Sequence, residues 1–179
     1  MNRTWLFVAI PVLLLGVFQP SSESLGQSGL QKLGTVDGWN IRGADGHCQA
    51  GYAMRSGLTQ FAVGIAPDGS FMTLQNIGWK LRANSSNMMR VTVEFDGERA
   101  FRTEALVIAM VGAIQIFVDL TDMSDADFWT HVLTAKSMQV KGKFGSSSSI
   151  SVDLDGVEAT LPLLRDCADQ FLSEITVPF

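Results

Sequence analysis

The chain has 179 residues, and its 13 lysine and arginine residues against 18 aspartate and glutamate residues leave a formal net charge of −5 at pH 7. Hydrophobic residues make up 46% of it, which is enough for a folded core. An acidic chain without a basic cluster lacks the electrostatic footprint of a nucleic-acid-binding protein, and we therefore expect no nucleic-acid partner.

The N-terminus has the three parts of a secretory signal peptide. Arg3 is a short positive region, residues 5–18 (WLFVAIPVLLLGVF) carry no charge, and small serine residues follow the Gln19-Pro20 helix breaker at positions 22 and 24. Fourteen apolar residues are fewer than the roughly 20 that a membrane-spanning helix needs. We therefore predict a cleaved signal over residues 1–24, a periplasmic or secreted location, and no stable membrane insertion after cleavage.

Cleavage there leaves 179 − 24 = 155 residues, the length of one domain. Residues 25–35 show no periodicity and are predicted to form a flexible leader. Residues 36–179 are predicted to form a single β-rich domain.

Cys48 and Cys167 are the two cysteines of the chain. Because an exported protein meets an oxidising compartment, we predict one intramolecular disulfide between them. A reactive thiol or half of a metal site are the alternatives, and the wide separation and the lack of a CxxC spacing argue against both.

The first half of the domain reads as short strands. Residues 36–42 place Trp39 and Ile41 on one face, and residues 48–54 follow an Asp45-Gly46 turn. Residues 58–66 and 71–77 are predicted to form a hairpin around the turn 67–70.

A second hairpin is predicted from residues 88–95, which alternate regularly, and residues 99–106, joined by the turn Asp96-Gly97. Residues 105–111 and 112–120 form the most apolar part of the mature chain, and we expect a pair of buried central strands there.

The pattern then changes to helix and strand. Ser124 and Asp127 resemble a capping box ahead of a short helix that ends near Lys136. Strands are predicted at 138–144 and 150–154, with a flexible turn at 145–149. Pro162 predicts either a kink in the last helix or a late helix start near Leu161.

In either case Cys167 faces the sheet. The predicted fold class is therefore α+β and mainly β: an antiparallel β-sandwich or rolled sheet with two short helices, of which the last is C-terminal.

One stretch of the chain is similar to a known family. The run Asp125…Phe128…Leu133-x-Ala135…Met138-x-Val140, followed by Val152-Asp153-Leu154-Asp155-Gly156…Ala159…Leu161…Leu164…Cys167, resembles the C-terminal half of small periplasmic proteins of Gram-negative bacteria. The invasion-associated locus B family is among them, and Trp39 before Cys48 is similar to their N-terminal strand pair. The resemblance implies a final helix packed on an antiparallel sheet and a periplasmic binding or accessory protein. It supplies no functional residues.

Few residues are candidates for catalysis or metal binding. His47 beside Cys48 would suit a nucleophile only with a free thiol, and His47, Asp45 and His131 match no metal-ligand spacing. The acids Asp119, Asp122, Asp125 and Asp127 lack the glycine and glutamate of an EF-hand loop. We therefore assign no catalytic, cofactor-binding or metal-ligating residue, and interpret the acids as a solvated turn and a helix cap.

The aromatic residues Trp39, Trp79, Trp129, Phe61, Phe71, Phe95, Phe101 and Phe117 are predicted to be core. The first functional hypothesis is an exported, non-enzymatic accessory or protein-binding domain whose partner is another envelope or secreted protein. The alternatives are a small exported hydrolase, and a secreted inhibitor or immunity protein that presents the loop 82–87 or the loop 145–149.

Overall fold

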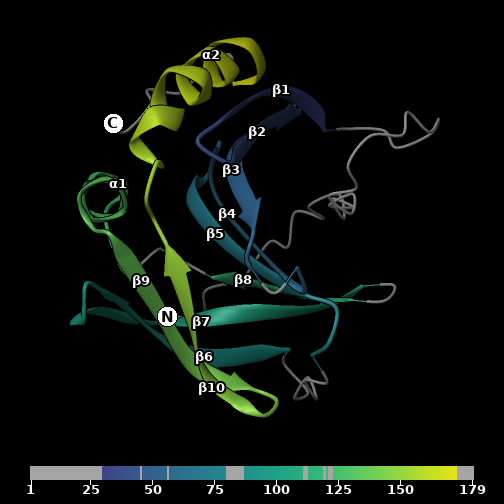
Figure 1. Ribbon diagram of the computed structural model, residues 1–179, viewed down its shortest axis with the longest axis vertical. Coiled ribbons are helices and arrows are strands. Elements are labelled where there is room, and N and C mark those ends of the chain that lie inside the picture. Colours follow the sequence, from purple (N-terminus) through teal and green to yellow (C-terminus); the bar gives the residue numbers. More distant parts are fainter. Residues whose placement is uncertain are drawn as a thin grey trace, which may run out of the picture.

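The computed structural model describes residues 30–44, 46–55, 57–79, 87–110, 113–118, 120 and 123–172. The predicted signal peptide, the leader up to residue 29 and most of the loop 82–87 lie outside these ranges. Figure 1 shows the described elements as one curved sheet with both helices on the same side of the molecule.

Within the described residues the sheet has ten strands in the order β1-β2-β3-β4-β5-β8-β7-β6-β9-β10. Every neighbouring pair is antiparallel. The strands are β1 (Gln31–Val36), β2 (Trp39–Ala44), β3 (His47–Ala53), β4 (Thr59–Ala66), β5 (Gly69–Asn76), β6 (Met88–Phe95), β7 (Glu98–Met110), β8 (Ala113–Val118), β9 (Ser137–Phe144) and β10 (Ser147–Asp153). The prediction of a mainly antiparallel β fold with two helices, the last of them C-terminal, is confirmed.

The start of the domain differs from the prediction. Residues 31–35, assigned to the flexible leader, belong to β1, which pairs with β2. Asp37 and Gly38 both have positive φ (48° and 84°) and form the two-residue turn between these strands. The predicted single strand 36–42 is therefore wrong, because Asp37-Gly38 is a tight hairpin turn.

Both predicted hairpins are present. β4 pairs with β5 from Thr59↔Asn76 to Ala66↔Gly69, and β6 pairs with β7 across Asp96-Gly97. The segments 99–106 and 105–111 are parts of a single strand, β7, which pairs with β6 along one edge and with β8 along the other.

The two helices are α1 (Asp125–Thr134) and α2 (Leu161–Phe171). Ser124 caps α1, as predicted: its Oγ accepts a hydrogen bond from the Asp127 N–H (3.1 Å) and donates one to the Asp127 carboxylate (2.6 Å). A 3-10 turn (Glu158–Thr160) precedes α2, and Pro162 lies in the first turn of that helix. The late helix start is thus the correct alternative.

The core lies between the helices and one face of the sheet. Phe128 and Trp129 of α1, and Leu164 and Cys167 of α2, are buried there. The two ends of the strand order also approach each other. The Tyr52 hydroxyl in β3 accepts from the Asp153 N–H (2.9 Å) and donates to the Asp153 carbonyl oxygen (2.8 Å), and the Trp39 indole N–H donates to the Asp155 carbonyl oxygen (2.9 Å).

No helix in the described part of the chain combines the length and the apolar character needed to cross a bilayer.

Candidate functional site

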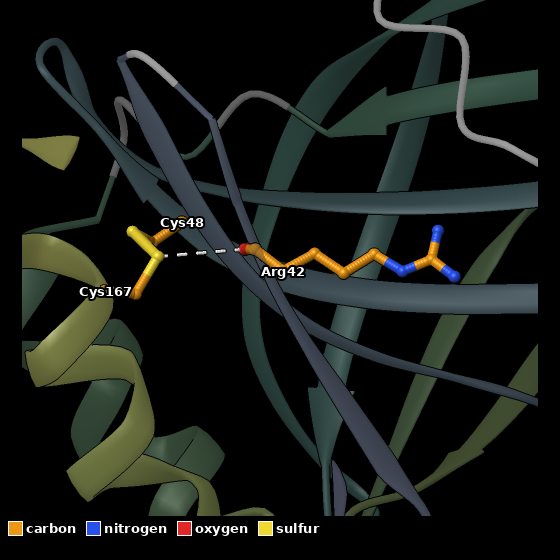
Figure 2. The surroundings of a disulfide bond; sticks show 3 residues. All are labelled: Arg42, Cys48 and Cys167. Atoms are coloured by element: carbon orange, nitrogen blue, oxygen red, sulfur yellow. Dashed lines mark hydrogen bonds between the residues drawn. A yellow bond between two sulfur atoms is a disulfide. The ribbon is translucent and has the colours of Figure 1, made fainter. Parts of the chain in front are cut away.

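The predicted cysteine pair is present as a disulfide between Cys48 of β3 and Cys167 of α2. Both side chains are fully buried, and Figure 2 shows the bridge beside the backbone of Arg42, whose carbonyl oxygen is 3.8 Å from the Cys167 sulfur. A Cβ placed on Gly43 would lie 2.5 Å from that sulfur, so only glycine leaves room for it. The bridge is a structural link between helix and sheet, and Cys48 has no free thiol for catalysis.

The two histidines lie on different elements. His47 is the first residue of β3; it is 8% exposed, and its ring centroid is 6.4 Å from that of Phe71. Burial lowers the pKa of His47. The exposed His131 on α1 stacks on Phe95 with centroids 5.1 Å apart. Asp45 lies outside the described residues, within which no three metal-binding side chains gather.

The described acids of the 119–127 stretch have structural roles. Asp127 takes part in the N-cap of α1. The Asp125 carboxylate accepts a hydrogen bond from the Ser70 N–H (2.9 Å), and the Trp129 indole N–H donates to the Ser70 hydroxyl (2.8 Å). Together these contacts hold α1 against the β4–β5 hairpin. Asp119 and Asp122 lie outside the described residues.

The remaining candidate is the face of the sheet that points away from the core. Because side chains alternate along a strand, the neighbours of Phe61, Val63, Met72 and Leu74 point to this other face. We call it the uncharged face. It is made up of residues of β4, β5, β7 and β8, together with Leu58, which precedes β4, and Ile77, which follows β5. It consists of Leu58, Gln60, Ala62, Gly64, Phe71, Thr73, Gln75, Ile77, Leu106, Ile108, Gln115 and Phe117.

The strand register arranges these side chains in rows across the sheet. One row is Gln60, Gln75, Gln115 and Ile108, and the next is Ala62, Thr73, Phe117 and Leu106. Leu58 and Ile77 continue the first hairpin by a hydrogen bond from the Ile77 N–H to the Leu58 carbonyl oxygen (3.2 Å). Such cross-strand neighbours are in contact range, so the rows form one surface.

Exposure within this face is uneven. Leu58, Ile77 and Leu106 are 48%, 57% and 37% exposed, and they are the exposed large apolar side chains among the described residues. Thr73 and Gln75, between them, are 4% and 7% exposed. Apolar residues that are exposed together on one face mark interaction surfaces more often than scattered ones do.

The same side of the sheet is charged over the first half of β7 and where it continues onto β6 and β9. Arg102 and Glu104 of β7 and Arg90 of β6 are exposed there, and Lys141 of β9 forms a salt bridge with Glu94 of β6 (2.6 Å). The absence of charge over β4, β5 and β8 is therefore a local property and not a general feature of this side.

One polar group at the centre of the uncharged face lacks a hydrogen-bond partner. The side-chain oxygen of Gln75 is buried and accepts no hydrogen bond. Buried carbonyl oxygens are nearly always paired, so this site requires a donor to be fully satisfied. Phe71 and Phe117 stack beside it with ring centroids 5.6 Å apart.

The aromatic prediction is correct for most positions and wrong for Phe117. Trp39, Trp129, Phe61, Phe95 and Phe101 belong to the core cluster, and Trp79 packs against it. Phe71 lies on the uncharged face but is itself buried (7% exposed), whereas Phe117 on the same face is only half-buried. The available sequence signal was that residues 58–77 carry a single charge, on Asp68 in the turn.

Comparisons with known proteins give no relative: no protein-family model, no curated protein and no solved structure matches this chain.

Proposed function

We propose that this chain is an exported, non-enzymatic accessory or binding domain, and that it binds another envelope or secreted protein through the uncharged face. The observation that carries the proposal is that the exposed large apolar side chains among the described residues, Leu58, Ile77 and Leu106, belong to that face. The core of a protein interface is depleted of charge and enriched in aromatic residues, as this face is.

Export is supported by two features that are independent of each other. The charge-free run 5–18 precedes small residues suited to signal cleavage. The disulfide between Cys48 and Cys167 suits an oxidising compartment. The likeness of residues 125–167 to the invasion-associated locus B family agrees with a periplasmic protein.

We further infer a rolled sheet rather than a sandwich as the scaffold of this face. The support comes from the hydrogen bonds that join Tyr52 and Trp39 to the backbone at residues 153 and 155. These contacts bring β2 and β3 to the far end of β10, as in a sheet that curls toward closure.

The test uses residues 25–179 carrying Ile77→Glu, with Gln139→Glu as the matched control on β9. Both variants add one negative charge to the same side of the sheet, but only the first places it on the uncharged face. We expect the unaltered domain and the Gln139→Glu variant to capture the same protein from an envelope extract, and Ile77→Glu to lose it. Equal capture by both variants, or substrate turnover by a domain that captures nothing, would refute the proposal.

A further inference from the structure

The strand β10 is the last in the sheet order of the described residues, so one of its edges pairs with β9 and the other is open. Its residues 147–152 (SSSISV) carry neither a charge nor a proline, and most of them are exposed. Such an edge is a template for pairing with another strand, and proteins usually protect it with charges, prolines or bulges. At the other end of the sheet, β1 carries Lys32 and an irregularity in its register. In β10 a similar irregularity is combined with a different kind of protection.

Three alternate residues of β10 direct their backbone groups to the open edge. The Asp153 N–H and carbonyl oxygen both bond to Tyr52 of β3 rather than to β9. Backbone direction alternates along an antiparallel pair, and the register between β9 and β10 is regular from residue 149 to residue 153. The N–H and C=O groups of Ser149 and Ser151 therefore face the same edge as those of Asp153.

Side-chain hydroxyls bond to the backbone at both ends of this row. The Tyr52 hydroxyl accepts from the Asp153 N–H (2.9 Å) and donates to its carbonyl oxygen (2.8 Å). The Ser147 hydroxyl likewise accepts from the Ser149 N–H (3.4 Å) and donates to its carbonyl oxygen (2.7 Å). A neighbouring strand would supply one acceptor and one donor to each such residue, and a hydroxyl can supply both. In the described part of the chain, nothing bonds to the outward backbone groups of Ser151 between them.

Local structure holds both hydroxyls in place. The Tyr52 ring packs edge-on against Trp39 and Phe61, with ring centroids 4.7 Å and 6.1 Å apart. Burial raises the pKa of Tyr52, so the hydroxyl keeps the proton that it donates to Asp153. Ser147 lies at the register irregularity at the start of β10, which lets its side chain fold back on the residue two positions later.

We infer that the hydroxyls of Tyr52 and Ser147 take the place of a neighbouring strand and keep β10 from pairing with β10 of a second copy of this chain. A second copy fits this edge because an antiparallel pair centred on Ser151 would place Ser149 of one copy opposite Asp153 of the other, so that no like charges meet. The inference goes beyond the proposed function and does not depend on it, because β10 contributes no residue to the uncharged face.

Residue-resolved amide hydrogen exchange of the oxidised protein, produced from the full chain, tests the two hydroxyls directly. Tyr52→Phe keeps the ring, and we expect the Asp153 amide to exchange roughly two- to tenfold faster, as the loss of one hydrogen bond allows. Ser147→Ala should do the same to the Ser149 amide. Ser148→Ala removes an exposed hydroxyl from the same strand and should change neither. Unchanged exchange of both amides in the first two variants would overturn the inference.

The variant that combines Tyr52→Phe and Ser147→Ala tests the edge itself. In size-exclusion chromatography with light scattering, we expect it to form a dimer that neither the wild-type protein nor Ser148→Ala forms. Adding Ser151→Pro removes the open N–H, and proline is tolerated where the N–H of an edge strand points outward. The triple variant should return to the association state of the wild type, whereas association caused by partial unfolding would persist.

Two further results would contradict this account of β10. One is a double variant whose Asp153 and Ser149 amides exchange faster while it associates no more than the wild type. The other is a dimer that remains when Ser151→Pro is added, because pairing through the β10 edge requires the N–H that proline lacks.

Discussion

Gly43 is the residue at which the sheet and the C-terminal helix come closest. A Cβ at this position would lie 2.5 Å from the Cys167 sulfur and 2.7 Å from the Phe171 ring. Position 43 of β2 therefore has to be glycine, because the disulfide and the end of α2 pack directly against the backbone there.

Gly43→Ala should accordingly destabilise the domain by about 1–3 kcal/mol, the usual cost of overpacking a closely packed site. Urea unfolding of the oxidised protein measures it as a lower midpoint with an unchanged slope. An unchanged midpoint would mean that α2 can move away from β2 at no cost.

Asp96 is an exposed turn residue that binds the start of β9. Its carboxylate accepts hydrogen bonds from the Ser137 N–H (2.9 Å), the Ser137 hydroxyl (3.2 Å) and the Lys136 N–H (3.1 Å). The Ser137 N–H above all, helped by the Lys136 N–H, lowers the pKa of Asp96 from its ordinary value of 3.8.

A lowered pKa in the folded state means that the unfolded chain binds the proton more readily. The stabilisation by Asp96 is therefore complete above pH 3.8 and is lost as the pH falls through the lower, folded-state pKa. Asp96→Asn keeps an acceptor and tolerates the positive φ of 49°, but it removes the charge. The melting temperature of the wild-type protein should exceed that of the variant at pH 6, and the two should converge below pH 3.8; a gap that is constant with pH would contradict this account.

At the scale of elements, the sequence correctly predicted the helices and strands that are determined by local signals. The Ser124 cap and the apolar stripe of Phe128, Trp129 and Val132 are local signals, and α1 follows them. Asp37-Gly38 was an equally local turn signal that was overlooked, so β1 was assigned to the leader. The continuity of β7 was not readable, because its two halves pair with different strands and only tertiary structure joins them.

Ser124→Ala should destabilise α1 and, with it, the contacts of Asp125 and Trp129 with Ser70 in the β4–β5 hairpin. The side-chain acceptor for the Asp127 N–H is lost, at a cost of about 1 kcal/mol for a typical N-cap. Ser124→Asp retains an acceptor and serves as the matched control. Chemical denaturation should rank the wild type and Ser124→Asp together above Ser124→Ala, and equal stability of all three would show that the cap contributes nothing.

At the scale of the whole molecule, the disulfide joins residues 119 positions apart and ties α2 to β3. Constraining so long a loop lowers the entropy of the unfolded chain, and native bridges of this kind typically contribute about 2–5 kcal/mol. The pairing could be predicted from the sequence because the chain has two cysteines and its N-terminus has the pattern expected of an export signal.

Replacing both cysteines with alanine should therefore lower the unfolding free energy by about 2–5 kcal/mol. Urea unfolding of the oxidised, reduced and doubly substituted proteins measures the loss. The reduced and substituted proteins should agree with each other. If the oxidised protein were no more stable than the other two, the disulfide would not stabilise the fold.

The uncharged face was the part of the molecule least accessible to sequence reasoning. Phe61 was correctly predicted to be core, but no prediction was made for Gln60, Ala62 and Gly64, which lie on the opposite side of its strand. Only the register places Gln60, Gln75 and Gln115 in one row, and only the fold puts Leu58, Ile77 and Leu106 on the same surface.

The most direct test of the proposed function is photocrosslinking in cells that produce the full chain. A benzophenone side chain at position 77 or 106 should give one and the same protein adduct in the envelope, and the same group at position 139, on the charged part of this side, should give none. Absence of an adduct at 77 and 106, or equal crosslinking at 139, would contradict the assignment of the uncharged face as the binding surface.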